Sequence, residues 1–319
     1  MEGESTDRSG GAVRRDGTAK PALTRAQKIV QRTKVGGALA VVVAAVLWSA
    51  STAYGHVITL LFATGLTGWS TLEASRMGLL GSARAVQGAA ATIVLMAVLF
   101  ATGPLSTGDD LPPAPLQMLL GALIVALPGV SFAGIGGRAD GEGEEGARIA
   151  MPGVQIIPLL CLPLFFLVSL RAYGGAAALA SVVALAKLGD VAGYYVGNAL
   201  GKRHPFPRLS PGKTVAGCVG SLVAGTAAGA GFSAAGWLGD PRFGLLSGLV
   251  LGALVNVAAQ AGDLLESALK RRAGVKDSGT TFGPSGGVLD LVDSFLLAAP
   301  LAATIGPLLF WWGTTAPPQ

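Results

Sequence analysis

Long stretches without a charged residue interrupt this chain, and they limit what it can fold into. No charge lies between Lys34 and Glu73 or between Arg148 and Arg171, and nothing after Asp293 is charged. A helix needs about 20 apolar residues to cross a hydrocarbon core of ~30 Å. Backbone groups in lipid must hydrogen-bond to one another, which favours helices, and the alternating pattern of barrel strands is absent. The sequence therefore predicts an all-α, polytopic integral membrane protein.

Composition supports this class. Only 13% of the 319 residues are charged and 51% are hydrophobic, whereas soluble domains carry roughly a quarter charged residues. The charges are too few to cover a water-soluble globule of this size. The apolar runs predict nine spanning helices, at about residues 36–52, 55–71, 85–103, 116–136, 150–170, 174–199, 214–237, 243–262 and 291–312.

The distribution of Lys and Arg predicts the orientation. Residues 17–34 are basic and contain no acid, so the N-terminus is expected to stay in the cytoplasm. Nine spans then place three further basic segments on that side and the C-terminus outside: residues 76–84, 202–213 and 270–276. We expect a location in the bacterial cytoplasmic (inner) membrane, with the N-terminus and the active site facing the cytoplasm.

Three regions are expected along the chain. Residues 1–34 are polar and lack apolar periodicity, which predicts a disordered basic tail. Residues 35–173 are expected to form N-terminal transmembrane helices. Residues 174–319 hold most of the polar groups within spans and are expected to form a C-terminal transmembrane catalytic region.

Small residues recur every four positions in the seventh predicted span. Gly217, Ser221, Gly225 and Gly229 lay a stripe along one helix face. Such stripes let helices approach closely in lipid. We therefore expect this stripe to pack against a neighbouring helix.

The first polar stretch covers residues 187–214. Lys187, Asp190 and Tyr194 share one helix face, and charges inside a span are costly and commonly functional. The loop that follows is basic, which attracts polyanions such as a nucleotide triphosphate or lipid head groups. The alternatives are an ion pair that only packs and an ordinary positive-inside loop. Its basic or potentially basic residues are Lys202, Arg203, His204, Arg208 and Lys213.

The second polar stretch covers residues 262–294. Asp263, Glu266 and Lys270 share one helix face, and Asp290 and Asp293 share another. Carboxylates at the ends of neighbouring helices can hold Mg²⁺, which is usually bound by one or two carboxylates and substrate phosphates. With lysines and arginines beside them, they suit metal-assisted phosphoryl or nucleotidyl transfer. An ion-coupled transporter could use the same groups, so these residues alone leave both classes open.

The order of residues in both stretches resembles a known family. The segment from Ser267, S-A-L-K-R-R-A-G-V-K-D-S-G-T-T-F-G-P-S-G-G-V-L-D-L-V-D, is similar to the C-terminal signature of the phosphatidate cytidylyltransferase (CDP-diacylglycerol synthase) family. The upstream block from Asp190 to Gly217 resembles the same family, so the likeness covers roughly residues 186–295. The positions in register are Asp190, Gly193, Tyr194, Gly197, Gly201, Lys202, Ser210, Pro211, Lys213, Thr214, Gly217, Gly262, Asp263, Leu264, Glu266, Ser267, Lys270, Arg271, Lys276, Asp277, Gly279, Gly286, Gly287, Asp290 and Asp293.

The resemblance implies a reaction and its participants. The phosphate of phosphatidate attacks the α-phosphorus of CTP, pyrophosphate leaves, and CDP-diacylglycerol forms for phospholipid biosynthesis. It also implies a Mg²⁺ cofactor, with Asp263 and Asp290 as main ligands and Asp293 and Glu266 in support; a second, monovalent cation is left open. Membrane lipids and a second copy of the chain in a homodimer are expected partners, and nucleic acid is not.

The resemblance assigns the remaining roles. Positioning and charge neutralisation are expected to do most of the catalysis, because the nucleophile is already an anion. Ser267 and Asp277 belong to the signature itself. Lys270, Arg271 and Lys276 are implied to hold phosphates, while Lys202, Ser210, Lys213 and Thr214 line the nucleotide site with support from Asp190.

Three positions depart from the family pattern. The family usually has His at the position of Ser285, Arg at that of Leu291 and Glu at that of Ala216. Each difference removes a polar group from near the expected site. A catalytically inactive or altered-substrate relative, and a membrane transporter, therefore stand as alternatives to the enzyme.

Overall fold

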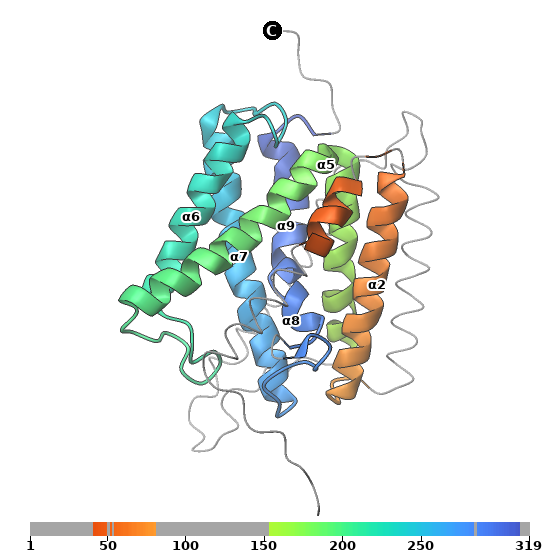
Figure 1. Cartoon of the computed structure of the whole chain (residues 1–319), viewed down its shortest axis with the longest axis vertical. Helices are drawn as coiled ribbons and strands as arrows, with labels where there is room; N and C mark the ends of the chain where they lie inside the picture. The colour runs from red at the N-terminus through yellow and green to blue at the C-terminus, as the bar shows by residue number, and fades with distance from the viewer. Residues whose placement is uncertain (1–40, 50–51, 53, 81–152, 284–285, 313–319) are drawn as a thin grey trace, which may run out of the picture.

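The chain folds into a bundle of helices (Figure 1). The computed structural model describes residues 41–49, 52, 54–80, 153–283 and 286–312. Within these ranges there is no β-strand, so the all-α prediction is confirmed for this part of the chain. Residues 41–49 are helical, and the named helices are α2 (Gly55–Arg76), α5 (Gly153–Leu200), α6 (Val215–Ala234), α7 (Leu245–Arg272), α8 (Leu289–Val292) and α9 (Phe295–Leu309).

Four of the described helical segments are long and apolar enough to cross a membrane. They correspond to the last four predicted spans, and they support an integral membrane protein. The predicted spans at 85–103 and 116–136 lie outside the described residues, as does part of the span at 36–52. The four segments are Phe166–Leu200, Val215–Ala234, Leu245–Arg272 and Leu289–Leu309.

Helix α5 is broken at Gly175. This residue has φ 82° and ψ 177°, a conformation open to glycine and rarely to other residues. The first part of α5 runs beside α2, and the second part crosses the bundle diagonally toward α6 (Figure 1). The chain therefore changes direction at Gly175, close to the boundary between the two predicted spans, 150–170 and 174–199.

The small-residue stripe of α6 packs against both of its neighbours. Gly217, Ser221, Gly225 and Gly229 are buried, and α6 contacts α5 and α7. A methyl group added at Gly229 would collide with the backbone of Gly248 and Gly252 on α7. The predicted packing role of the stripe is therefore confirmed, and the close approach brings the polar ends of these helices together.

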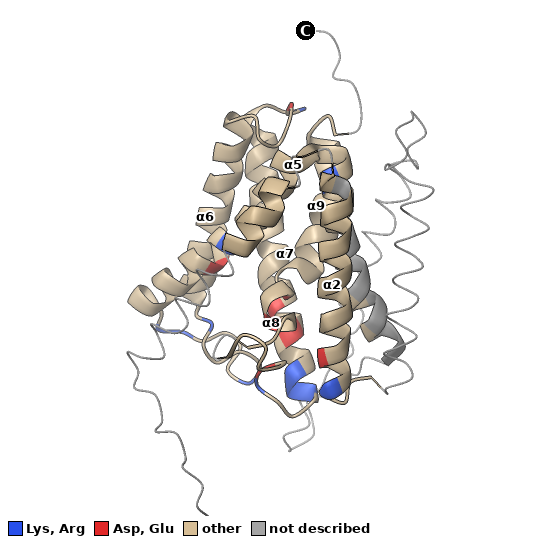
Figure 2. Ribbon diagram, turned by 45° about the vertical axis from the view of Figure 1, so that its right-hand side comes forward, with Lys and Arg blue, Asp and Glu red and all other residues tan. Residues whose placement is uncertain are grey.

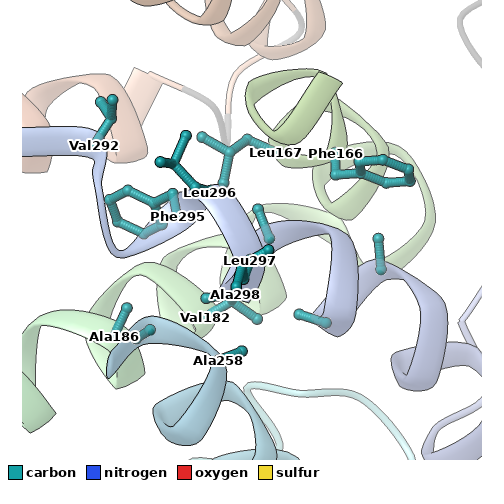
Figure 3. Close-up of a cluster of buried hydrophobic side chains, with 14 of the residues drawn as sticks. Phe166, Leu167, Val182, Ala186, Ala258, Val292, Phe295, Leu296, Leu297 and Ala298 are labelled. Carbon is teal, nitrogen blue, oxygen red and sulfur yellow. The ribbon is translucent and has the colours of Figure 1, made fainter. Parts of the chain in front are cut away.

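Helix α9 lies in the core of the bundle. Its apolar side chains pack among residues of α5 and α7, including Val182, Ala186 and Ala258 (Figure 3). Leu296 and Ala298 are fully buried there. This packing fixes the segment that carries Asp290 and Asp293 against the polar end of α7.

Two helices extend beyond the ends of the predicted membrane spans. Helix α7 continues beyond residue 262 to Arg272, because the first helix-stopping signal is Gly274, whose φ of 72° suits the left-handed conformation after a helix end. The span predicted to begin at residue 291 starts instead with the short helix α8 at Leu289. Both extensions place the signature carboxylates within or directly beside helices, as their shared helix faces predicted.

Candidate active site

The two polar stretches meet through Lys213 and Asp263. The Lys213 Nζ atom lies 2.5 Å from the Asp263 Oδ2 atom and also donates a hydrogen bond to the backbone oxygen of Gln260 at 3.2 Å. The neighbouring Thr214 caps α6, because its hydroxyl oxygen accepts from the Gly217 N–H at 3.1 Å. The cap fixes the start of α6 and so directs Lys213 toward α7.

Lys187 lies at a second crossing point, between α5 and the start of α9. Its ammonium donates to the Ser294 Oγ atom at 2.8 Å and to the Leu291 backbone oxygen at 3.0 Å. Two carboxylates are close, Asp190 at 3.5 Å and Asp293 at 3.9 Å. This intramembrane lysine is therefore satisfied by acceptors from two segments, and it joins the upstream stretch to the signature.

Asp263 and Asp293 lie side by side where α7 passes the α8–α9 junction. Their carboxyl groups are close enough to influence each other electrostatically. The approach depends on Gly262, where an added methyl group would collide with the Asp293 backbone oxygen. The Asp293 Oδ1 atom also accepts from the Ser294 N–H at 2.6 Å, which orients the carboxylate. Two carboxylates, whose oxygens are hard metal ligands, therefore lie close together.

Lys270, about two turns after Asp263 on α7, bridges two further carboxylates. Its Nζ atom lies 2.6 Å from Glu266 Oε2 and 2.5 Å from Asp290 Oδ1. The other Asp290 oxygen accepts from the Ser278 hydroxyl at 2.6 Å and from the Gly287 N–H at 2.7 Å. Asp290 is consequently held on both oxygens, by α7 on one side and by the loop after α7 on the other.

Sequence reasoning missed Glu73, which lies next to this loop. It sits on α2, is 1% exposed, and its carboxylate accepts hydrogen bonds from the signature segment. The available signal was its position: it is an acid directly after the longest uncharged run of the chain. A buried carboxylate near the end of a helix needs hydrogen-bond partners, and residues more than 200 positions away provide them.

The remaining predicted site residues divide into contacting and exposed groups. Arg271 donates from Nη1 to the Val275 backbone oxygen at 3.3 Å and lies 3.5 Å from that of Leu209, so it links the two loops. Ser210 and Ser267 are half-buried. Lys202, Lys276 and Asp277 are exposed, without a side-chain partner among the described residues.

The departures from the family pattern have different surroundings. Ser285 lies outside the described residues. Leu291 contributes its backbone oxygen to Lys187, a contact that any side chain at this position permits. Ala216 is half-buried in the first turn of α6. None of the contacts that surround Asp263 and Asp290 uses the side chain of Leu291 or Ala216.

The donor set suits phosphate chemistry. In the described part of the chain, no three His, Cys, Asp or Glu side chains gather as a ready-made metal cage. The Asp263–Asp293 pair nevertheless fits Mg²⁺, which commonly takes one or two carboxylates and completes its coordination with substrate phosphates and water. Lys213 and Lys270 stand beside the carboxylates, and ammonium groups stabilise phosphate charge.

The fold and the charged end of the bundle define a class of protein. Charged residues gather mainly at one end of the helices (Figure 2), and the chain is a helical membrane protein with a site of carboxylates and ammonium groups at that end. Residues 30–309 match the model of the cytidylyltransferase family. The match spans most of the chain, which therefore belongs to that family.

Curated relatives share part of this sequence. The phosphatidate cytidylyltransferase of Bacillus subtilis is 42% identical over 111 residues, which cover 35% of this chain and 40% of the relative. The phosphatidate cytidylyltransferase of Aquifex aeolicus is 38% identical over 114 residues, 36% of this chain and 41% of the relative. That of Helicobacter pylori is 36% identical over 142 residues, 44% of this chain and 52% of the relative. The chain thus spans about half or less of the length of these relatives.

Proposed function

We propose that this protein is a phosphatidate cytidylyltransferase. A phosphate oxygen of phosphatidate forms a bond to the α-phosphorus of CTP, the bond from that phosphorus to the bridging oxygen breaks, and pyrophosphate leaves. The product is CDP-diacylglycerol. The observation that carries the proposal is the ion pair between Lys213 and Asp263, because it joins the two polar stretches into one site. Membership of the cytidylyltransferase family supports the same reaction.

We propose Mg²⁺ as the cofactor. Asp263 and Asp290 would be its main ligands, with Asp293 and Glu266 in support. Bound there, the ion would neutralise phosphate charge as the reaction proceeds. A second, monovalent cation is part of the same proposal, and rates measured in K⁺ and in Na⁺ would reveal it.

The protein's own residues would bind and orient the two anionic substrates. Lys213 and Lys270 are the ammonium groups nearest the carboxylates, and Arg271 links the two loops beside them. No general base is required, because the attacking phosphate is already ionised. The exposed Lys202, Lys276 and Asp277 would contact substrate at the rim, while Ser210, Thr214, Ser267 and Asp190 would support the nucleotide site.

We further propose how the protein sits in the membrane. Nine spans would place the N-terminal tail and the active site on the cytoplasmic side of a bacterial inner membrane. Residues 35–173 would form an N-terminal helical region and residues 174–319 the catalytic region. A homodimer would let the apolar helix faces bury against a second copy.

The proposal is tested with detergent-solubilised protein, α-labelled CTP, phosphatidate and Mg²⁺. Labelled CDP-lipid is expected from the natural sequence and is expected to disappear in Asp263→Asn and Asp290→Asn. Asp240→Asn is the matched control, because Asp240 is exposed in the connection between α6 and α7, at the opposite end of both helices from Asp263 and Lys213. Absence of labelled lipid from the natural sequence, with CTP binding retained, would point to another lipid phosphate; absence of CTP binding would favour an inactive relative.

A further inference from the structure

Helix α2 contacts the signature segment through the side chains of Glu73 and Trp69. Five donors lie within hydrogen-bonding distance of the Glu73 carboxylate, four of them in residues 278–289, and the single Ser278 proton is shared with Asp290. The Glu73 Oε1 atom accepts from Thr281 Oγ1 at 2.9 Å, and its Oε2 atom accepts from Ser278 Oγ at 3.0 Å. The fifth donor is the indole N–H of Trp69, one turn earlier on α2, which also donates to Thr281 at 3.1 Å.

The same carboxylate caps α8. The backbone N–H groups of Val288 and Leu289 donate to Glu73 at 3.0 Å and 2.9 Å. The first N–H groups of a helix have no partner within it and need an acceptor from elsewhere. Residue Val288, at the cap position of α8, makes no side-chain capping bond. A residue from the N-terminal half of the chain thus provides the acceptor that would normally come from the adjacent sequence.

Glu73 is one contact away from Asp290. The Ser278 hydroxyl lies between the two carboxylates, 3.0 Å from Glu73 and 2.6 Å from Asp290. The Ser278 backbone N–H adds a hydrogen bond to the same Asp290 oxygen at 3.0 Å. Any displacement of Ser278 would therefore move two of the donors that orient Asp290.

The loop backbone is shaped around these carboxylates. A methyl group added at Gly287 would collide with Glu73 and Ser278, and one added at Gly286 would collide with Asp290. Gly286 also has a φ of 89°, which favours glycine. The glycine pair therefore lets the backbone approach Glu73 and Asp290 closely enough to donate to both.

We propose that Glu73 is a positioning residue, which fixes residues 278–283 and 286–289 and thereby directs the Asp290 carboxylate toward Lys270. The inference rests on the proposed cytidylyltransferase activity, to which it adds a role for the N-terminal helices. Glu73 touches no reacting atom. It acts through Ser278 and the start of α8, and an amide in its place offers one oxygen for five donors.

The experiment compares Glu73→Gln, Ser278→Ala and the double variant. Misplacement of a catalytic group by about 1 Å can cost ~100-fold in rate, so we expect Glu73→Gln to lower kcat by about 10- to 100-fold. Because both residues act on Asp290, the double variant is expected to be no slower than the slower single variant. Ser70→Ala is the control, since Ser70 is a buried α2 hydroxyl without a hydrogen-bond partner in the described structure.

A second measurement reports on the loop without using activity. Lys276 and Arg208 are both exposed in loops. Glu73→Gln is expected to accelerate tryptic cleavage after Lys276 several-fold and to leave cleavage after Arg208 unchanged. If Glu73→Gln does not accumulate as folded protein, Glu73→Asp replaces it, because the shorter side chain keeps the charge and cannot reach all five donors.

Two results would overturn the inference. One is unchanged cleavage after Lys276; the other is a double variant whose loss in kcat equals the product of the single losses. If the natural sequence makes no CDP-lipid at all, the proposed function fails, and the cleavage measurement still decides whether Glu73 fixes the loop.

Discussion

The ammonium of Lys213 lies 2.5 Å from the carboxylate of Asp263, and this ion pair closes one end of the α6–α7 contact. Both side chains are partly buried, with exposed fractions of 19% and 31%. An ammonium with limited water around it interacts more strongly with a nearby anion than one in bulk solvent. Lys213 is thereby positioned both to neutralise Asp263 and to attract a phosphate.

Replacement of Lys213 by methionine should therefore impair nucleotide use. We expect Lys213→Met to raise the KM for CTP and to lower kcat/KM by about 10- to 1,000-fold, the range for loss of one charge-stabilising group. Initial rates at varied CTP measure the effect. Arg208→Met is the control, because Arg208 is exposed in the same loop; an equal loss in both variants would mean that only the overall loop charge matters.

Lys187 should contribute to stability. Its ammonium donates to Ser294 and Leu291 and faces two carboxylates, and hydrogen bonds to a charged group are worth about 1.5–3 kcal/mol. Lys187→Met is expected to lower the thermal midpoint in detergent by several degrees, and Lys187→Arg by less. Leu188→Met, at an exposed apolar neighbour, serves as the control and is expected to leave the midpoint unchanged.

The α6–α7 contact should tolerate no added methyl group at Gly229. A Cβ atom there would collide with the α7 backbone, whereas one at Gly231 meets nothing within 4 Å. Overpacking costs about 1–3 kcal/mol, so Gly229→Ala is expected to lower the thermal midpoint and Gly231→Ala to preserve or raise it. Equal midpoints for the two variants would contradict the close approach of these helices.

Gly287 should be required for activity. A methyl group would collide with Glu73 and Ser278 and push away the N–H that donates to Asp290 at 2.7 Å. Gly287→Ala is expected to lower the rate of CDP-lipid formation at least about tenfold by misplacing Asp290. Gly212→Ala, in a loop position with open space, is the control, and wild-type rates in both variants would argue against the tight glycine turn.

The helical class and the identity of the charged stretches could be predicted from the sequence alone. A charge in hydrocarbon is costly, so a long uncharged run marks a segment that can cross a membrane. This property depends on the residues of the segment alone. The order of residues in the signature predicted Asp263, Lys270 and Asp290 as site residues. The family match confirms the resemblance to the cytidylyltransferases. The four-residue spacing of Gly217 and Gly229 likewise predicted a packing face, which the structure confirms.

Which charged groups contact one another depended on the tertiary structure. Sequence spacing placed Asp263 and Glu266 on one helix face, but it did not indicate that Lys213 would pair with Asp263 while Lys270 joins Glu266 to Asp290. Those pairings follow from the packing of α6, α7 and α8, and helix packing depends on contacts between segments distant in the sequence.

Glu73 shows most clearly what could be predicted from the sequence and what could not. The sequence shows that this acid follows a long apolar run, and it predicts a membrane-spanning chain with a polar site at residues 262–294. That Glu73 caps α8 and contacts Ser278 follows from the packing of the helices, because hydrogen bonds across more than 200 residues form only once the helices have packed. Hydrophobicity is a property of each residue, whereas an active site is a property of the distances that packing imposes between residues.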